Sequence, residues 1–139
     1  MDSIVDDIDI AIINILEKEA RASFADIARR LTLSPSAIRE RVQRLEDHGV
    51  IRQYQIALDY KQLGYDIEAF ILVKVFHGKL QSFLRVIKTY KEVKDAYRIT
   101  GNYNVHLKVI LKDRMHLQDF IDRIMVYGDT HTSLILSDI

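Results

Sequence analysis

Four arginines fall within residues 31–52, although the 139-residue chain as a whole has a formal net charge of zero. This segment begins LTLSPSAIRERVQRL, and its Ser34-Pro35 pair predicts the start of a helix, because serine caps helix N-termini and proline fits the first helical position. Ile38, Val42 and Leu45 would form its buried stripe. At about 100° per residue, the outward face then carries these side chains: Ser36, Arg39, Glu40, Gln43 and Arg44.

The outward side chains have the chemistry needed to read DNA. Arginine can bind a guanine edge through two hydrogen bonds, glutamine can bind adenine, and glutamate can accept from cytosine. Ser34 and Ser36, at the helix N-terminus, could hold a backbone phosphate. The alternative is an ordinary solvated face, on which Glu40 and Arg44 would form a helix-stabilising ion pair.

The preceding residues favour DNA binding. Apolar residues recur with helical spacing in residues 8–16 and again in residues 24–31, where Ser23 and Asp26 would begin the second helix as a capping-box variant. Two short helices and a tight turn before a basic helix form a helix-turn-helix arrangement. Gly49 would end the basic helix, and the alternation in VIRQYQIAL, residues 50–58, predicts a strand. We therefore expect a helix-turn-helix domain over residues 1–56.

A second domain is predicted over residues 67–139, after a linker of residues 57–66. Its apolar patterns predict strands at 67–77, 93–100, 104–111 and 130–138, with helices at 80–87 and 117–125 and Gly128 closing the second helix. This βαββαβ order is ferredoxin-like, which gives an α+β fold class. Both helices would cover one sheet face, and the other would mix apolar with charged residues and pack on a second copy. Its expected residues are Phe70 or Ile71, Ala96, Arg98, Lys108 and Ile110.

Composition excludes several other kinds of protein. There is no cysteine, so disulfides, thiolate nucleophiles and cysteine-based zinc sites are impossible. The five histidines show no metal-ligand spacing, and the sequence contains no nucleophile motif or phosphate-binding loop. No apolar run approaches the ~20 residues that span a bilayer, and the acidic N-terminus is the reverse of a signal peptide. We expect a cytoplasmic protein without enzymatic activity, cofactor or metal.

Three stretches together resemble the Lrp/AsnC, or feast/famine, transcription regulators: LSPSAIRERVQRLEDHGVI, TGNYN and the closing THTSLILSDI. The resemblance extends over residues 6–139. It implies a sequence-specific regulator that binds double-stranded DNA through a winged helix-turn-helix domain and senses an amino acid with a ferredoxin-like domain. It also implies homodimers that assemble further, often into octamers.

The resemblance also indicates where the effector would bind. The implied cleft residues are Thr100, Gly101, Asn102, Tyr103, Asn104, Thr130, Thr132 and Ser133. A glycine turn exposes N–H groups that can take a carboxylate, although the same residues also suit a plain hairpin turn. Members of the family commonly have Gly-Asp-Tyr-Asp here, whereas this chain has asparagines. The amides lack the charge that would bind a ligand ammonium group, which leaves the effector open.

Two other functions fit the same two-domain plan. Proteins similar to siroheme decarboxylases share it, and here Arg98, His106 and Lys108 would hold a tetrapyrrole. An architectural protein would use the same DNA contacts without effector control, with weak sequence selectivity and steep salt dependence. The arginine-bearing helix favours the regulator over the enzyme.

Overall fold

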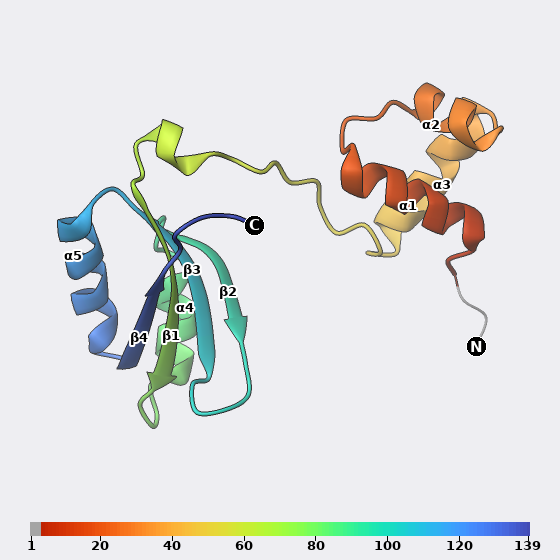
Figure 1. The fold of residues 1–139 in the computed structure, drawn as a ribbon. Coiled ribbons are helices and arrows are strands. Elements are labelled where there is room, and N and C mark those ends of the chain that lie inside the picture. The colour runs from red at the N-terminus through yellow and green to blue at the C-terminus, as the bar shows by residue number, and fades with distance from the viewer. Residues whose placement is uncertain (1–3) are drawn as a thin grey trace. The chain divides into compact units, whose positions relative to one another are not determined.

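The computed structural model describes residues 4–139 (Figure 1). The chain divides into two compact units, with the division between Ala57 and Leu58. Each unit has its own hydrophobic core.

The first unit contains three helices: α1 (Asp7–Lys18), α2 (Phe24–Leu31) and α3 (Pro35–Asp47). A polar side chain caps each N-terminus, and the caps predicted at Ser23 and Ser34 are confirmed. Thr32 ends α2 in the left-handed conformation, which makes the tight turn to α3. The buried core residues come from all three helices: Ile12, Ile27, Ala28, Ile38 and Val42.

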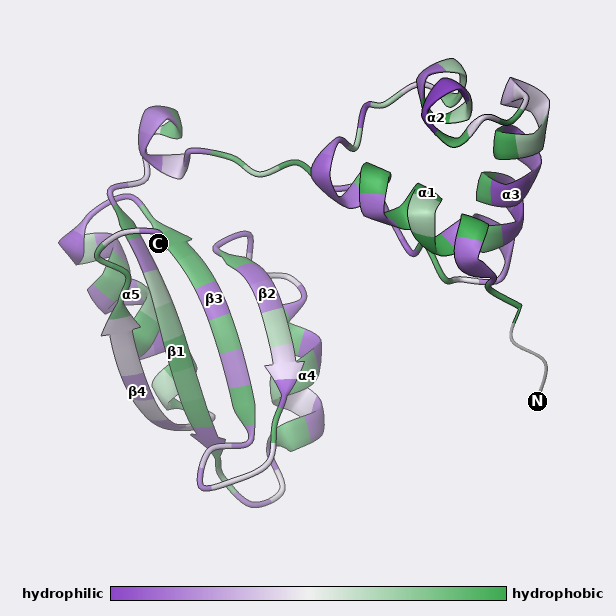
Figure 2. Ribbon diagram, turned by 45° about the vertical axis from the view of Figure 1, so that its right-hand side comes forward, coloured by the Kyte–Doolittle hydropathy of each residue, from purple (hydrophilic) through white to green (hydrophobic). Residues whose placement is uncertain are grey.

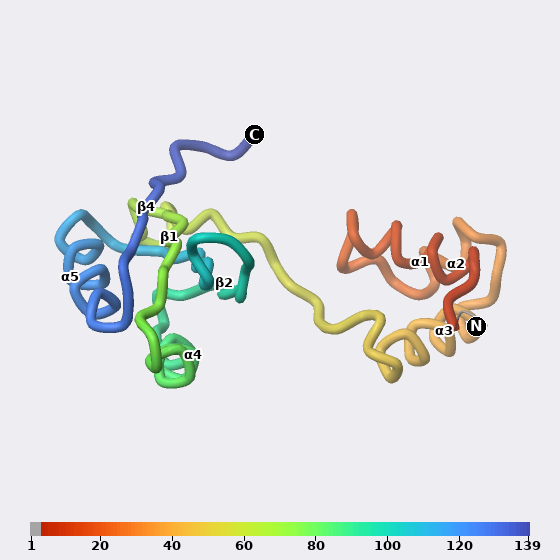
Figure 3. The backbone as a smooth tube through the Cα atoms, turned by 90° about the horizontal axis from the view of Figure 1, so that it is seen from below, coloured from red at the N-terminus to blue at the C-terminus, as the bar shows by residue number. Residues whose placement is uncertain are grey.

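The strand predicted at residues 50–58 is wrong for the single chain. Residues 52–59, yellow in Figure 3, form neither helix nor strand. A strand requires a neighbouring backbone to satisfy its N–H and C=O groups, and residues 4–57 contain no other strand. The segment is nevertheless tied to α3, because the Tyr54 hydroxyl donates to Glu46 at 2.9 Å. Burial and this hydrogen bond raise the pKa of Tyr54 to about 12.

The second unit is a four-stranded antiparallel sheet in the order β2-β3-β1-β4, with two helices and a short 3₁₀ turn, η1. Its elements are η1 (Tyr60–Leu63), β1 (Ile67–Val75), α4 (Leu80–Ile87), β2 (Val93–Arg98), β3 (Val105–Leu111), α5 (Arg114–Met125) and β4 (Gly128–Leu134). In Figure 2 the strands lie in front and α4 and α5 behind. Phe83 and Phe120 of these helices pack with the buried residues of β1 and β3. The predicted ferredoxin-like βαββαβ fold is confirmed.

The register corrects part of the predicted sheet face. Directly paired residues share a face, and Phe70 pairs with Lys108 on the face away from the helices, whereas Ile71 lies in the core. Ala96 and Arg98 were expected on that open face, but they pair with the core residues Leu107 and Val105.

A bulge in β2 explains this error. The register shifts between Val93 and Asp95, which reverses the alternation after the bulge. Asp95 and Tyr97 therefore occupy the open face, opposite Lys108 and His106.

Gly128 has a different role from the one predicted. Helix α5 ends at Met125, and Gly128 is the first residue of β4, opposite Val75 of β1. A Cβ atom at this position would lie 2.3 Å from the carbonyl oxygen of Lys74. Strand β4 therefore begins two residues earlier than predicted, at a position where only glycine allows the backbone to approach β1 so closely. It ends at Leu134.

Candidate nucleic-acid interface

The outward face of α3 is exposed where the sequence predicts it. Ile38, Val42 and Leu45 are buried, and this fixes which side of the helix faces solvent. Five predicted DNA-binding residues of the helix, together with Asp47 and His48, line one shallow hollow: Ser36, Arg39, Glu40, Gln43 and Arg44. The structure therefore brings the predicted DNA-binding residues of α3 together on one surface.

Serine side chains organise the start of α3. The Ala37 N–H donates to the Ser34 hydroxyl at 3.1 Å, and the hydroxyl oxygens of Ser34 and Ser36 lie 3.1 Å apart. Pro35 is the first helical residue, as predicted. This N-terminus presents exposed hydroxyl groups and the positive end of the helix dipole, which together suit an anionic oxygen.

The polar side chains on this face differ in how firmly they are held. The guanidinium of Arg39 lies 5.3 Å from the centroid of the Phe24 ring, a cation–π contact with α2. Gln43 donates to Asp47 at 2.9 Å. Within residues 4–139, Glu40 has no hydrogen-bond or ion-pair partner. The ion pair of the solvated-face alternative does not form, because Arg44 is bonded to α1 instead.

A carboxylate network at the start of α1 holds the other two arginines of α3. The Arg41 guanidinium donates to Asp6 at 2.7 and 2.9 Å and to Asp9 at 3.0 Å. Arg44 donates to Asp9 at 3.0 Å. The hydrogen bond from Arg41, with one from the Asp9 backbone, lowers the pKa of Asp6 to about 2.

The network contains two residues of the candidate site, Asp6 and Asp9, that sequence reasoning missed. Asp6 and Asp9 form a complete capping box, in which each side chain accepts from the other's backbone N–H. Their spacing of three residues before an apolar run was a signal that could have been recognised. No local pattern, however, relates them to arginines 32 or more residues away.

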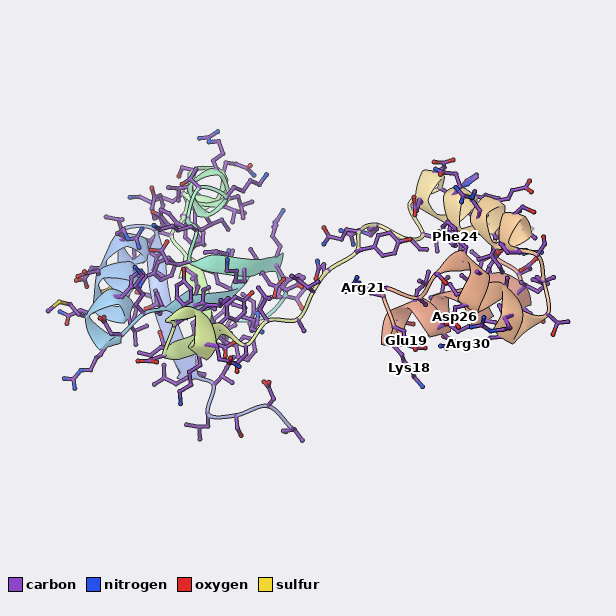
Figure 4. The ribbon with its side chains drawn as sticks, turned by 90° about the horizontal axis from the view of Figure 1, so that it is seen from above. Lys18, Glu19, Arg21, Phe24, Asp26 and Arg30 are labelled. Atoms are coloured by element: carbon purple, nitrogen blue, oxygen red, sulfur yellow. The ribbon has the colours of Figure 1, made fainter. Side chains whose placement is uncertain are left out.

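Another ion-pair cluster fixes the connection between α1 and α2 (Figure 4). Arg30 donates to Glu19 at 2.5 and 2.9 Å and also pairs with Asp26 at 2.9 Å. Lys18, the last residue of α1, and Arg21, in the connection itself, are exposed nearby. These contacts stabilise the helix that precedes the turn to α3.

The turn predicted to bind an effector joins β2 to β3, and Gly101 in it has a φ of 110°. Asn104 is committed to backbone contacts: its side-chain oxygen accepts from the Val75 N–H at 2.9 Å, and its own N–H donates to Val73 at 3.0 Å. The Tyr103 ring lies 6.1 Å from that of His131. Asn102, by contrast, is exposed and has no hydrogen-bond partner in the described chain.

The predicted effector residues of β4 are only partly close to this turn. Thr130 pairs with Val73, which on its other side pairs with Val105 at the end of the turn. Thr132 and Ser133 lie farther along β4, and Ser133 faces the open side whereas Thr130 and Thr132 face the helices. A single chain therefore gathers residues 100–104 and Thr130 at one end of the sheet but does not gather all eight residues.

The tetrapyrrole alternative receives no support from the sheet. His106 and Lys108 lie on the open face, whereas Arg98 pairs with Val105 on the helix side. Among residues 4–139 there is also no cluster of three or more histidine, aspartate or glutamate side chains that could hold a metal ion.

No helix in the described part of the chain is long and apolar enough to cross a membrane.

Comparison with known proteins covers both units. Residues 5–46 match the AsnC-type helix-turn-helix domain, and residues 68–139 match the Lrp/AsnC ligand binding domain. The chain belongs to the Lrp/AsnC family. It is a transcriptional regulator of this type, with a DNA-binding helix-turn-helix domain and a ligand-binding domain.

Relatives of this Lrp/AsnC regulator match over nearly their whole length. The HTH-type transcriptional regulator FL11 of Pyrococcus furiosus is 36% identical over 139 residues, covering 98% of this chain and 92% of the relative. The structure of Bacillus subtilis LrpC superposes with a TM-score of 0.92 at 33% identity, covering 99% and 98% of the two chains. A Neisseria meningitidis regulator solved as its L-Met complex gives a TM-score of 0.89 at 26% identity, covering 97% and 92%.

Proposed function

We propose that this Lrp/AsnC regulator binds double-stranded DNA sequence-specifically through the outward face of α3. The observation that carries the proposal is the exposed set of Arg39, Glu40 and Gln43 on a helix fixed by its caps and its buried stripe. These three side chains differ in the base edges that they bind. Ser34 and Ser36 at the helix N-terminus, and Arg44 at the rim, would contact phosphates and set the docking angle. The chain would act without catalysis.

Alanine substitution of the base-reading residues tests this proposal. Arg39→Ala and Gln43→Ala should each weaken binding to a duplex selected by the wild-type chain by about 1–3 kcal/mol, the value of a lost base contact. Binding to a scrambled duplex of the same length should change much less. Fluorescence anisotropy at fixed salt measures both affinities.

Arg85→Ala serves as a matched control, because Arg85 is an exposed arginine on α4 in the other unit. Equal losses on the selected and scrambled duplexes would assign Arg39 or Gln43 to phosphate contacts. Unchanged binding in both variants would remove α3 from the interface, and a selectivity that is low in the wild type would favour the architectural alternative.

We also propose that an amino acid or a related small molecule controls the regulator, bound near Thr100, Gly101, Asn102 and Tyr103 with hydroxyl groups of β4. The L-Met complex of the Neisseria meningitidis relative supports this class of effector. Since the Asn104 side chain already accepts from Val75, Asn102 is the turn amide that remains for a ligand. Homodimers, and octamers built from them, would bring further residues to the cleft.

Substitution of the two turn amides separates a ligand contact from a structural one. Asn102→Asp should tighten binding of L-amino acids, measured by calorimetry, by about 1–3 kcal/mol, because it restores a charged partner for the ammonium group. Asn104→Asp keeps the acceptor for Val75 and should change ligand affinity less. The same gain in both variants would contradict this assignment, and no gain in either would remove the turn from the ligand site.

A further inference from the structure

Asp9 is a fully buried carboxylate that faces the helix proposed to read DNA. It accepts hydrogen bonds from three groups: the Asp6 backbone at 3.1 Å, Arg41 at 3.0 Å, and Arg44 at 3.0 and 3.3 Å. A buried charge of this kind is stable only when paired, so the two arginines are fixed to α1 as long as Asp9 is ionised.

The network divides the three arginines of α3 into two groups. Arg41 and Arg44 face two carboxylates, Asp6 and Asp9, so that the four charges cancel. Arg39 contacts the ring of Phe24 and, within residues 4–139, has no carboxylate partner. The uncompensated positive charge on this helix therefore lies where base contacts are proposed.

Arg44 is held without being withdrawn from the surface. Its side chain is 46% exposed and lines the outward hollow, and only its Nη2 atom is bonded to Asp9. Nη1 and Nε remain available to a phosphate oxygen. A guanidinium anchored at one nitrogen can make one oriented contact, whereas a free guanidinium can bind any polyanion in many orientations.

We propose that Asp9 is a positioning residue for sequence selectivity. It orients Arg44 toward one phosphate, and it neutralises Arg41 and Arg44 so that they do not bind DNA of any sequence. The proposal rests on the proposed function of α3. In this proposal the buried carboxylate of Asp9 sets the balance between specific and non-specific DNA binding. Base contacts alone would not set this balance.

The test is Asp9→Asn in the full chain, with binding measured over a salt series. The probes are a duplex selected by the wild-type chain from a random library and a scrambled duplex of equal length. The substitution keeps the size of the side chain and removes its charge, so the scrambled duplex should bind about three- to tenfold more tightly. The slope of log affinity against log salt should steepen by about one for this duplex. Affinity for the selected duplex should rise less or fall, so the selectivity ratio should drop about five- to tenfold.

Asp7→Asn is the matched control, because Asp7 is an exposed acid on the same turn of α1 without a partner in the described chain. It changes net charge equally but does not touch Arg41 or Arg44. An equal effect in this control would overturn the proposal. So would a parallel loss on both duplexes with an unchanged salt slope, which is the result of a merely structural role.

Arg44→Gln keeps the proposal testable if Asp9→Asn does not fold, as judged by its thermal melt. This exposed substitution should make the salt slope for the selected duplex shallower by about one and lower selectivity. If the double variant Asp9→Asn/Arg44→Gln folds, adding Asp9→Asn to Arg44→Gln should no longer steepen the slope of log affinity against log salt for the scrambled duplex. A steepening as large as that expected for Asp9→Asn alone would overturn a role of Asp9 through Arg44. If Arg39→Ala and Gln43→Ala also leave selectivity unchanged, the proposed function of α3 fails as well. If those two lower selectivity and Asp9→Asn does not, only the role of Asp9 is excluded.

Discussion

Glu92 shows how a single buried carboxylate can stabilise the second unit. Its side chain is 6% exposed and is bonded to Arg123 and, at 3.0 Å, to Nε2 of His116. The Lys112 N–H donates to Nδ1 of His116, so Nε2 must carry the proton that is donated to Glu92. Burial raises the pKa of Glu92, but the hydrogen bonds from His116 and Arg123 outweigh it and lower the pKa to about 2.

Glu92→Gln should therefore destabilise the second unit in a pH-dependent way. Because the folded-state pKa lies below the ordinary value of 4.5, ionised Glu92 stabilises the fold above pH 4.5, and this contribution is lost as the pH falls toward 2. We expect a deficit of about 2–3 kcal/mol at pH 7, which narrows between pH 5 and pH 3. Urea unfolding followed by tyrosine fluorescence measures it, since six of the seven tyrosines lie in residues 58–139.

The control for this experiment is Asp119→Asn, an exposed carboxylate on α5. It removes the same charge and should leave the free energy of unfolding nearly unchanged. A Glu92→Gln deficit that stays constant from pH 7 to pH 3 would contradict the role of the ionised carboxylate.

Residue patterns predict local contacts better than distant ones. Ser34 and the outward face of α3 could be predicted because a cap and a helical stripe depend on neighbours within a few residues. Glu92 meets His116 and Arg123 across 24 and 31 residues, and Asp9 meets Arg44 across 35. Such contacts are set by the packing of whole elements, so a single sequence contains no spacing rule for them.

At the scale of elements, strand β4 depends on one glycine. The Gly128 backbone approaches β1 so closely that a methyl group would overlap the Lys74 carbonyl. Gly64, in the segment before β1, has open space around it but a φ of 93°. The two glycines are therefore required for different physical reasons, one for space and one for backbone conformation.

Gly128→Ala should cost about 1–3 kcal/mol or more of unfolding free energy, because β4 must move away from β1. Gly64→Ala should cost only about 1 kcal/mol, the strain of a left-handed alanine. Amide hydrogen exchange should show faster exchange in β4 for Gly128→Ala alone. Unchanged protection of β4 in that variant would contradict the packing argument.

Elements were predicted well where they close their own hydrogen bonds. Helices satisfy their backbone groups internally, and the strands of the second unit find partners within the unit. Residues 50–58 have the alternation of a strand but no neighbour to pair with in the described chain. The bulge after Val93 reversed the facing of Ala96 and Arg98, because alternation alone cannot locate an extra residue.

At the scale of the whole molecule, the open sheet face is the proposed surface of self-association. Phe70 is 38% exposed and stacks with His106 at 5.2 Å, and Tyr97 of the same face is 58% exposed. Exposed aromatic groups amid polar neighbours are typical of interaction surfaces. DNA-binding helix-turn-helix units usually work in pairs, so self-association through this face would serve DNA binding.

Phe70→Asp should lower the mass of the assembly measured by light scattering at micromolar concentration to that of a smaller species, because it buries a charge in the interface. Met115→Asp is the control, since Met115 is 73% exposed on α5, away from the open face. A wild-type chain that is monomeric, or a Phe70→Asp variant of unchanged mass, would contradict the assignment of this face.

The most direct test of the central claim is a hydroxyl-radical footprint on the DNA upstream of the regulator's own gene, at physiological salt. The wild-type chain should protect discrete segments spaced by whole helical turns of about 10 base pairs, and Arg39→Ala should need about 5- to 150-fold more protein for the same protection, which corresponds to the loss of one base contact. An absence of discrete protection at every concentration of the wild-type chain, or the same protection by Arg39→Ala at equal concentration, would contradict sequence reading by α3.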